Sequence, residues 1–200
     1  MQCIKDTIKN INIVIGCSIG CSYCYARMNN NRFHTIDDFN KPVFFENKLK
    51  MLDNKRHTAY LLTGQSDLSG WNEEWKDKVF SKMKENKNTQ YIFLTKRPEN
   101  IKLKETPDNG WFGVTVTSSK EKTRIDYLRN NIKAKHYHIT FEPMFDDVGK
   151  LDLSNISWIV IGTETGNRKG KISSKREWVF NIYNQAKEKN IPVFMKEDLL

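Results

Sequence analysis

Three closely spaced cysteines are the residues of this chain best suited to chemistry. Cys17, Cys21 and Cys24 follow the apolar run 11–15 and form a C-x3-C-x2-C pattern. A four-iron cluster takes four ligands, commonly cysteine thiolates, so this loop supplies three of them and leaves one iron open. We therefore predict a [4Fe-4S] cluster held by three thiolates, with a ligand that is not protein on the fourth iron.

Other uses of these thiols stay open. Together with Cys3, His34 or His57 the three cysteines could hold a structural zinc ion. However, zinc loops usually carry two separated ligand pairs, and the sequence has no second pair. Disulfides are disfavoured because four cysteines in 200 residues, without an export signal, are typical of a reducing compartment. We therefore expect a cytoplasmic protein in which Cys3 is a bystander.

Length and charge limit the classes of protein and of partner. A chain of 200 residues is expected to form one domain, residues 1–200, with a sizeable core. No apolar stretch approaches the ~20 residues of a membrane span, so we expect no membrane partner. The formal net charge of +9 favours a polyanionic partner. A general bias toward Lys, Asn and Ile weakens that last inference.

Short apolar segments alternate with helical patterns along the chain. Predicted strands, rich in β-branched and aromatic residues, are 11–16, 58–64, 90–96, 111–117, 136–142, 157–163 and 192–196. Predicted helices are 72–86 and 174–189, with weaker helical composition in 43–53 and 119–130; Ser174 to Glu177 reads as a capping box. Such alternation indicates parallel βαβ units, and six or seven of them predict a partial (β/α) barrel. Its chemistry should gather at the carboxyl ends of the strands, where the cysteine loop begins.

Polar positions on two strands indicate a lumen. The two-residue period places four polar side chains on one face of segment 136–142, namely His136, His138, Thr140 and Glu142. Segment 111–117 places three small residues on one face, namely Gly113, Thr115 and Thr117, and so leaves room for a ligand. Buried polar groups are costly unless they are partnered, so we predict a polar lumen. The alternative, that these are merely satisfied core residues, stays open.

Four further strand ends fall at the same predicted edge. They are residues 63–67, Lys96 with Arg97, residues 162–166, and Lys196 with Glu197. Gly64 would allow close approach of a ligand, and a cation after the third strand could hold a carboxylate or phosphate. For each of them, a solvated strand end is an equally good interpretation.

The cysteine pattern, with Tyr23 just before the last cysteine, resembles the radical SAM superfamily. That resemblance implies a partial barrel and S-adenosylmethionine chelated to the open iron through its amino and carboxylate groups. It also implies that Tyr23 packs near the adenine, and that backbone at Thr63, Gly64 and Gln65 receives the amino group. The usual glycine pair and acidic residue of that segment are missing here.

A closer resemblance rests on four segments in order: 94–98, 111–116, 142–143 and 158–166. They are similar to the radical-SAM-like three-Cys-motif proteins of phages and mobile elements, whose activity is unassigned. Related proteins occur as pairs, which implies a second radical SAM protein as a partner. Residues 23–27 are similar to a loop of spore photoproduct lyase relatives, which act on DNA.

The resemblance implies an enzyme that cleaves S-adenosylmethionine reductively and removes a hydrogen atom from an unidentified substrate. A reductant such as flavodoxin or ferredoxin would supply the electron. Pocket residues would then be Thr115, Thr117, His138, Glu142 and Glu164. Two alternatives remain: a cluster-bearing nucleic-acid-binding or regulatory protein without turnover, and a zinc-stapled nucleic-acid-binding protein.

A basic loop suggests the substrate class. Segment 167–176 holds five basic residues, and Arg27 and Arg32 follow the cysteine loop. By the barrel argument, this loop lies on the same edge as the cluster and could clamp a phosphate backbone. The hypothesis is a nucleic acid or nucleotide substrate, with a peptide or small metabolite as the alternative.

Overall fold

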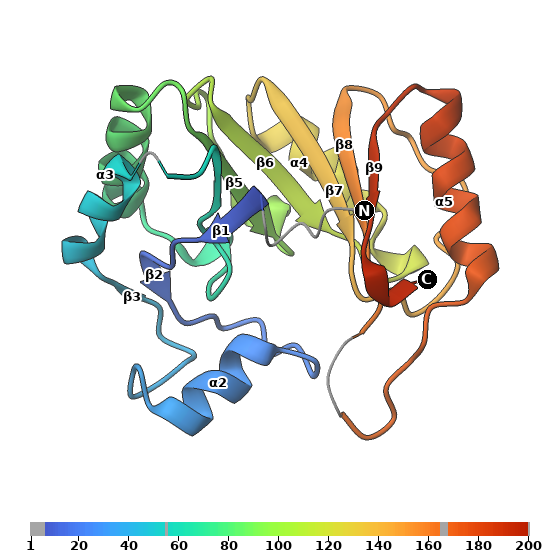
Figure 1. Ribbon diagram of the computed structural model, residues 1–200, viewed down its shortest axis with the longest axis horizontal. Helices are drawn as coiled ribbons and strands as arrows, with labels where there is room; N and C mark the ends of the chain where they lie inside the picture. Colours follow the sequence, from blue (N-terminus) through green and yellow to red (C-terminus); the bar gives the residue numbers. More distant parts are fainter. Residues whose placement is uncertain (1–6, 55, 165–167, 200) are drawn as a thin grey trace.

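A single curled sheet organises the protein. The computed structural model describes residues 7–54, 56–164 and 168–199. Seven parallel strands form a half-barrel (Figure 1). Their order is β1 (Ile8–Asn10), β4 (Ala59–Leu61), β5 (Gln90–Thr95), β6 (Gly110–Thr115), β7 (His136–Phe141), β8 (Ile156–Ile161) and β9 (Val193–Met195). The predicted partial (β/α) barrel is therefore confirmed.

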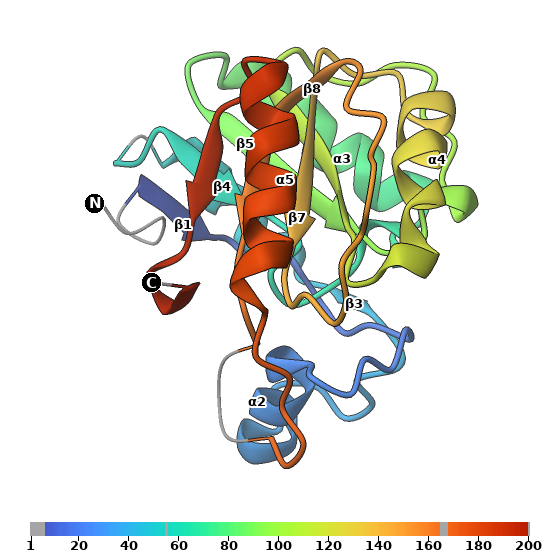
Figure 2. The ribbon, with the colours of Figure 1, turned by 90° about the vertical axis from the view of Figure 1, so that its right-hand side faces the viewer.

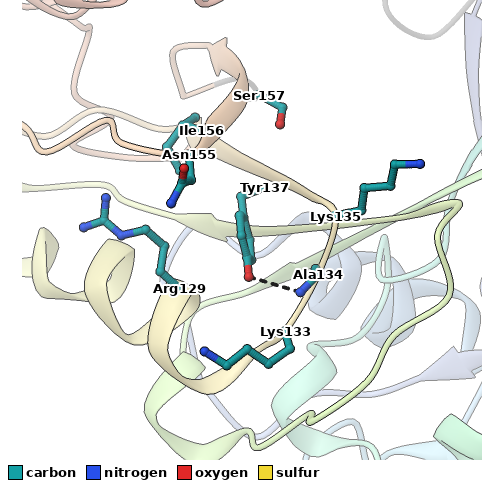
Figure 3. Close-up of a pocket in the computed structure, with 8 residues that line it drawn as sticks. All are labelled: Arg129, Lys133, Ala134, Lys135, Tyr137, Asn155, Ile156 and Ser157. Carbon is teal, nitrogen blue, oxygen red and sulfur yellow. Dashed lines mark hydrogen bonds between the residues drawn. The ribbon is translucent and has the colours of Figure 1, made fainter.

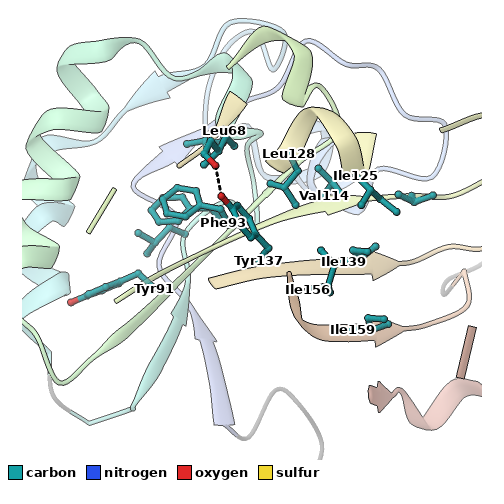
Figure 4. Packing of buried hydrophobic residues seen from close by; sticks show 14 of the residues in the cluster. Leu68, Tyr91, Phe93, Val114, Ile125, Leu128, Tyr137, Ile139, Ile156 and Ile159 are labelled. Carbon is teal, nitrogen blue, oxygen red and sulfur yellow. Dashed lines mark hydrogen bonds between the residues drawn. The ribbon is translucent and has the colours of Figure 1, made fainter. Parts of the chain in front are cut away.

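Three helices cover the outer face of this sheet: α3 (Glu73–Glu85), α4 (Thr123–Asn131) and α5 (Arg176–Glu188) (Figure 2). Their buried apolar side chains, among them Val79 on α3 and Ile182 on α5, belong to one core with the strand residues. Figure 4 shows part of this core, with Ile125 and Leu128 of α4 near Val114 of β6. The rings of Phe93 and Phe112 stack at its centre, 4.9 Å apart. Because helices run back from the carboxyl ends of the strands, they leave that edge to loops.

Smaller elements lie between these units. A two-stranded antiparallel ribbon joins β2 (Val14–Ile15) to β3 (Val43–Phe44), and α2 (Tyr25–Phe33) lies between its strands in the chain. Short 3-10 helices complete the structure: η1 (Glu46–Asp53), η2 (Leu68–Gly70), η3 (Pro98–Asn100), η4 (Ser119–Glu121) and η5 (Glu197–Leu199). Within the described ranges, no helix is both long and apolar enough to cross a bilayer.

The predicted strand 11–16 was wrong in its bounds. The main sheet takes residues 8–10 as β1, and the chain leaves it after Ile11 donates its amide proton to the Leu61 carbonyl. Phe45 then donates to the Ile13 carbonyl, so Val14 and Ile15 pair with β3 instead. Segment 43–53, for which the sequence indicated a weak helix, instead forms the short strand β3 followed by the 3-10 helix η1.

Two helix starts also differ from the sequence expectation. The capping box at Ser174 does not form: Lys175 is the N-cap of α5, and the Ser174 hydroxyl has no partner among the described residues. Helix α2 was missed because its nine residues bury only Ala26 and Asn30, too few to produce an apolar stripe. Local pattern is thus weakest in the segment nearest the cysteines.

Candidate functional site

The cysteine loop begins at the carboxyl edge of the sheet. Gly16 bridges to Ser66, just beyond β4, and donates its amide proton to the Gln65 carbonyl over 3.0 Å. Its φ of +113° favours glycine, and a Cβ there would lie 2.9 Å from the Pro42 Cα. Cys17 then donates to the Phe39 carbonyl at 2.6 Å. These backbone contacts therefore fix the position of Cys17 at the edge of the sheet.

Helix α2 fastens the other end of the loop. Cys24 is its N-cap, with the sulfur accepting a hydrogen bond from the Arg27 amide at 3.4 Å. The Arg27 guanidinium reaches back to the Cys17 carbonyl at 2.8 Å and to Asn40 at 3.0 Å. The amino end of α2 therefore lies against the Cys24 sulfur.

The three thiols lie close enough to influence one another. All three are free and half-buried. Burial raises the pKa of the Cys17 thiol, and the negative charges of Asp67, Cys21 and Cys24 raise it further. A metal ion or cluster would bind these cysteines as thiolates and release their protons.

The three sulfurs can be considered as ligands of two kinds of metal site. In the described part of the chain, no three Cys, His, Asp or Glu side chains are gathered to hold a single ion. Tetrahedral zinc bonds of ~2.3 Å would hold the sulfurs within about 4 Å of each other. An iron–sulfur cluster is wider than one ion and spreads its thiolates. Three soft sulfurs on one loop are a donor set that fits an iron–sulfur cluster, and they would also fit zinc.

Two tyrosines flank the last cysteine. The half-buried Tyr23 ring meets Phe145 edge-on at 5.5 Å, and the Lys96 ammonium lies 5.9 Å from its centroid. Tyr25, which the sequence analysis left without a role, donates its hydroxyl proton to the Gly64 carbonyl at 2.5 Å. Burial raises the pKa of both phenols. The Tyr25 bond joins α2 to the end of β4.

A buried carboxylate that the sequence analysis did not single out organises the same edge. Asp67 accepts four hydrogen bonds from three residues: the amide and hydroxyl of Ser69 at 3.0 and 2.7 Å, the Thr95 hydroxyl at 2.6 Å, and the Lys96 amide at 2.8 Å. It thereby ties the end of β5 to the loop after β4, beside Cys17. An isolated Asp after a strand carries no distinguishing sequence signal.

The segment predicted to receive an amino group is already bonded within the chain. Thr63 is buried and accepts from the Leu94 amide at 2.7 Å. The Gly64 carbonyl accepts from Tyr25, and the Gln65 carbonyl accepts from Gly16. Gly64 does allow a close approach, but to side chains of this chain: a Cβ there would lie 3.0 Å from the Asn12 amide oxygen.

Glu142 and Lys196 form an ion pair across the carboxyl end of β8. Gly162 lies beneath them, because a Cβ there would come within 3.0 Å of both side chains. Both partners remain about one-quarter exposed. The negative charge of Glu142 also raises the pKa of Tyr25. Opposite charges therefore lie beside α2 at the middle of this edge.

Other predicted pocket residues are buried or engaged. Thr117 donates its amide and hydroxyl protons to the Glu121 carboxylate at 2.7 and 2.8 Å, and the Thr115 carbonyl accepts from Arg124. Both threonines are less than 5 % exposed. They hold η4 and α4 against β6 and do not present their side chains to solvent.

The basic loop after β8 is partly used internally. Arg168 donates to both oxygens of the buried Glu164 carboxylate, at 2.5 and 2.8 Å, and this pairing lowers the pKa of Glu164. Lys169 and Lys171 are exposed. Residues 165–167 of the predicted strand end and loop lie outside the described residues. The Arg168 guanidinium is therefore bound to a carboxylate of this chain and is not the free phosphate ligand that the sequence suggested.

The space predicted for a ligand above Gly113 is filled. A Cβ at Gly113 would lie 2.4 Å from two atoms of the His138 ring. The imidazole is 1 % exposed, its Nε2 lies 3.1 Å from the Phe93 carbonyl, and its Nδ1 has no partner among the described residues. The expectation that this small face leaves room for a ligand is wrong at Gly113, because the neighbouring strand fills it.

His138 should make the protein sensitive to acid. Burial lowers its folded-state pKa to about 4, from an ordinary value of ~6.5 in the unfolded chain. As pH falls from about 6.5 toward 4, the unfolded state takes up this proton first, so the fold loses up to about 3 kcal/mol. We expect His138→Gln to remove this part of the acid loss. Urea unfolding of both proteins at pH 7 and pH 4.5 measures it, and parallel losses would contradict the assignment.

A hollow of about 560 Å³ lies elsewhere, at the amino end of β7 and β8 (Figure 3). Lys133, Lys135 and Arg129 surround it, and Arg129 is already paired with Asp126 and Asp152. Because parallel strands place it at the opposite edge from the cysteine loop, it contributes nothing to the thiol site.

Comparisons with known proteins correct the family assignment. The model of a family described as protein of unknown function (DUF5131) matches residues 2–198. The assignment to the radical SAM superfamily, and to the three-Cys-motif family within it, is therefore wrong. Searches of curated proteins and of solved structures found no match.

Proposed function

We propose, for a chain that belongs to the DUF5131 family, that Cys17, Cys21 and Cys24 hold a [4Fe-4S] cluster that binds S-adenosylmethionine. The protein would be an enzyme that cleaves this cofactor reductively and removes a hydrogen atom from a substrate. One observation carries the proposal: three free, half-buried thiols share one loop at the carboxyl edge of a parallel half-barrel. The cluster is inferred from the chain's own thiols, whereas S-adenosylmethionine as the ligand of its open iron is the expectation implied by the resemblance of the cysteine pattern.

The chain's residues have distinct tasks in this proposal. Arg27 and the start of α2 fix the loop so that its sulfurs keep their spacing. Tyr23 offers an aromatic surface beside Lys96 for the adenine. Glu142 and Lys196 present opposite charges to the amino and carboxylate groups of an amino-acid moiety. The buried residues Thr115, Thr117 and His138 would support the lumen wall.

The bound cluster and cofactor would supply one-electron cleavage of the sulfonium carbon–sulfur bond. The chain's part is to orient the cofactor and exclude water. An electron must come from outside, so the partners would include a reductant such as flavodoxin or ferredoxin, and a second protein of the same kind is compatible with this site. The three free thiols would be kept reduced for the cluster in a reducing compartment such as the cytoplasm.

Addition of S-adenosylmethionine to the reconstituted, reduced protein should change its EPR spectrum, because the cofactor would join the open iron. The matched control is Lys196→Met, which keeps the three thiols but removes the cation opposite Glu142. We expect the control to retain the cluster signal and to need more cofactor for the same change. A spectrum unchanged at saturating cofactor would rule the proposal out, and a spectral change without formation of 5′-deoxyadenosine would indicate binding without turnover.

A further inference from the structure

We propose that single-stranded nucleic acid is the substrate of this site and binds across the carboxyl edge, between α2 and the first turn of α5. This substrate class presupposes the cluster chemistry proposed above, whereas binding itself does not require the cluster. Figure 1 shows α2 and the start of α5 at that edge. Hydrogen bonds agree with the view, since Tyr25 joins α2 to the end of β4 and Ser174 donates to Thr163, just after β8.

The exposed side of α2 combines an aromatic ring with a cation. Phe33 is 64 % exposed, and the Arg32 guanidinium lies 5.1 Å from its ring centroid. Met28 is 54 % exposed and lies one helical turn before Arg32. Singly exposed apolar rings are ordinary on protein surfaces, so the feature of interest here is the guanidinium that lies against the exposed ring. A base stacked on Phe33 would leave its phosphate beside Arg32.

The first turn of α5 repeats the arrangement. Phe180 is 44 % exposed, and the Arg176 guanidinium lies 5.3 Å from its ring centroid. Between the two helices, the Lys96 ammonium lies beside the Tyr23 ring next to Cys24. The Tyr23 ring is the one assigned to the adenine above, so two exposed cation–ring pairs, one on α2 and one on α5, remain for the substrate. Paired aromatic rings and cations are the surface that binds single strands through stacking and phosphate contacts.

Several charges at this edge are paired within the chain. Three carboxylates there are neutralised inside the chain: Glu142 by Lys196, Glu164 by Arg168 and Glu121 by Arg124. The cations beside Phe33 and Phe180 lie on rings, which cannot neutralise them. These two exposed cation–ring pairs, on a chain whose formal net charge is +9, suit a polyanion that also carries flat rings. A neutral metabolite would form no ion pair with the Arg32 and Arg176 guanidinium groups.

Fluorescence anisotropy with labelled oligo-dT, oligo-rU and a mixed-sequence duplex of about 15 nucleotides tests binding by the full chain. We expect both single strands to bind more tightly than the duplex, whose bases are already stacked. The ribose and deoxyribose arms distinguish RNA from DNA. Phe33→Ala and Phe180→Ala should each weaken binding about tenfold, because each removes one stacking platform.

The charge test uses two double variants that each remove two positive charges. Replacing Arg32 and Arg176 by Ala should lower the log–log salt slope by about 0.7 for each phosphate group that the variant no longer binds. Replacing Lys133 and Lys135 by Ala removes the same charge from the opposite edge (Figure 3) and should leave the affinity nearly unchanged. The side chains replaced in the ring and charge variants are all exposed, so every variant should keep the parent's melting temperature.

Equal weakening by the two charge variants, or duplex binding as tight as single-strand binding, would overturn the proposal. If the parent binds no oligonucleotide but its EPR spectrum still responds to S-adenosylmethionine, only the substrate class fails. If single strands bind but the parent forms no cluster, the substrate interpretation is overturned, and a nucleic-acid-binding surface without this chemistry remains.

Discussion

Cys21→Ala should leave the protein colourless and without bound iron after anaerobic reconstitution, whereas the parent should take up about four irons per chain. Three thiolates hold all the irons that the protein ligates, so removal of one opens a second iron and the cluster should not survive. Cys21 is half-buried and its backbone carbonyl, which accepts from Cys24, is retained in alanine. The fold should therefore persist while the cluster is lost.

Iron and acid-labile sulfide analysis, together with visible absorption, measures the effect. Cys3→Ala is the matched control, because it also removes one thiol and should leave the cluster intact. Full iron content in Cys21→Ala would disprove ligation by the three cysteines. Equal loss in Cys3→Ala would indicate four cysteine ligands and no open iron. One zinc ion per chain in the parent, without sulfide, would favour the structural zinc interpretation.

Gly113→Ala should destabilise the fold by about 3 kcal/mol, because the new methyl group would overlap the buried His138 ring. The ring cannot move away freely, since it is enclosed and its Nε2 contacts the Phe93 carbonyl. His138→Ala alone should also destabilise by leaving a cavity. The double variant should lose about 2 kcal/mol less unfolding free energy than the sum of the two single losses, because the new methyl group occupies the space that the imidazole vacates.

Urea unfolding of the parent, the two single variants and the double variant gives this coupling free energy. Gly70→Ala is the control, since a Cβ there would meet only the Pro42 ring at 3.4 Å, an ordinary contact. Its stability should stay within about 0.5 kcal/mol of the parent. Strictly additive losses in the double variant would show that Gly113 is not there to make room for the imidazole.

These expectations depend on features of two kinds, local and long-range. The sequence by itself determined the strand and helix pattern, since two-residue and four-residue periods are local properties. Segments 90–96, 136–142 and 72–86 correspond closely to β5, β7 and α3. The spacing of the cysteines is equally local, and so was their place at the carboxyl edge once the barrel was inferred.

Only the tertiary structure decided which polar residues are accessible. Gly113 and His138 lie on neighbouring strands, and their spatial overlap depends on the β6–β7 register, which no local pattern specifies. The hydrogen bonds that the end of β5 donates to Asp67 likewise join residues far apart in the chain, as does the ion pair between Glu142 and Lys196. Helix α2 takes its stability from tertiary hydrogen bonds, such as those of the Arg27 guanidinium, and not from an apolar stripe. Burial and pairing are set by the assembled fold, so composition and spacing could propose the thiol site but not its surroundings.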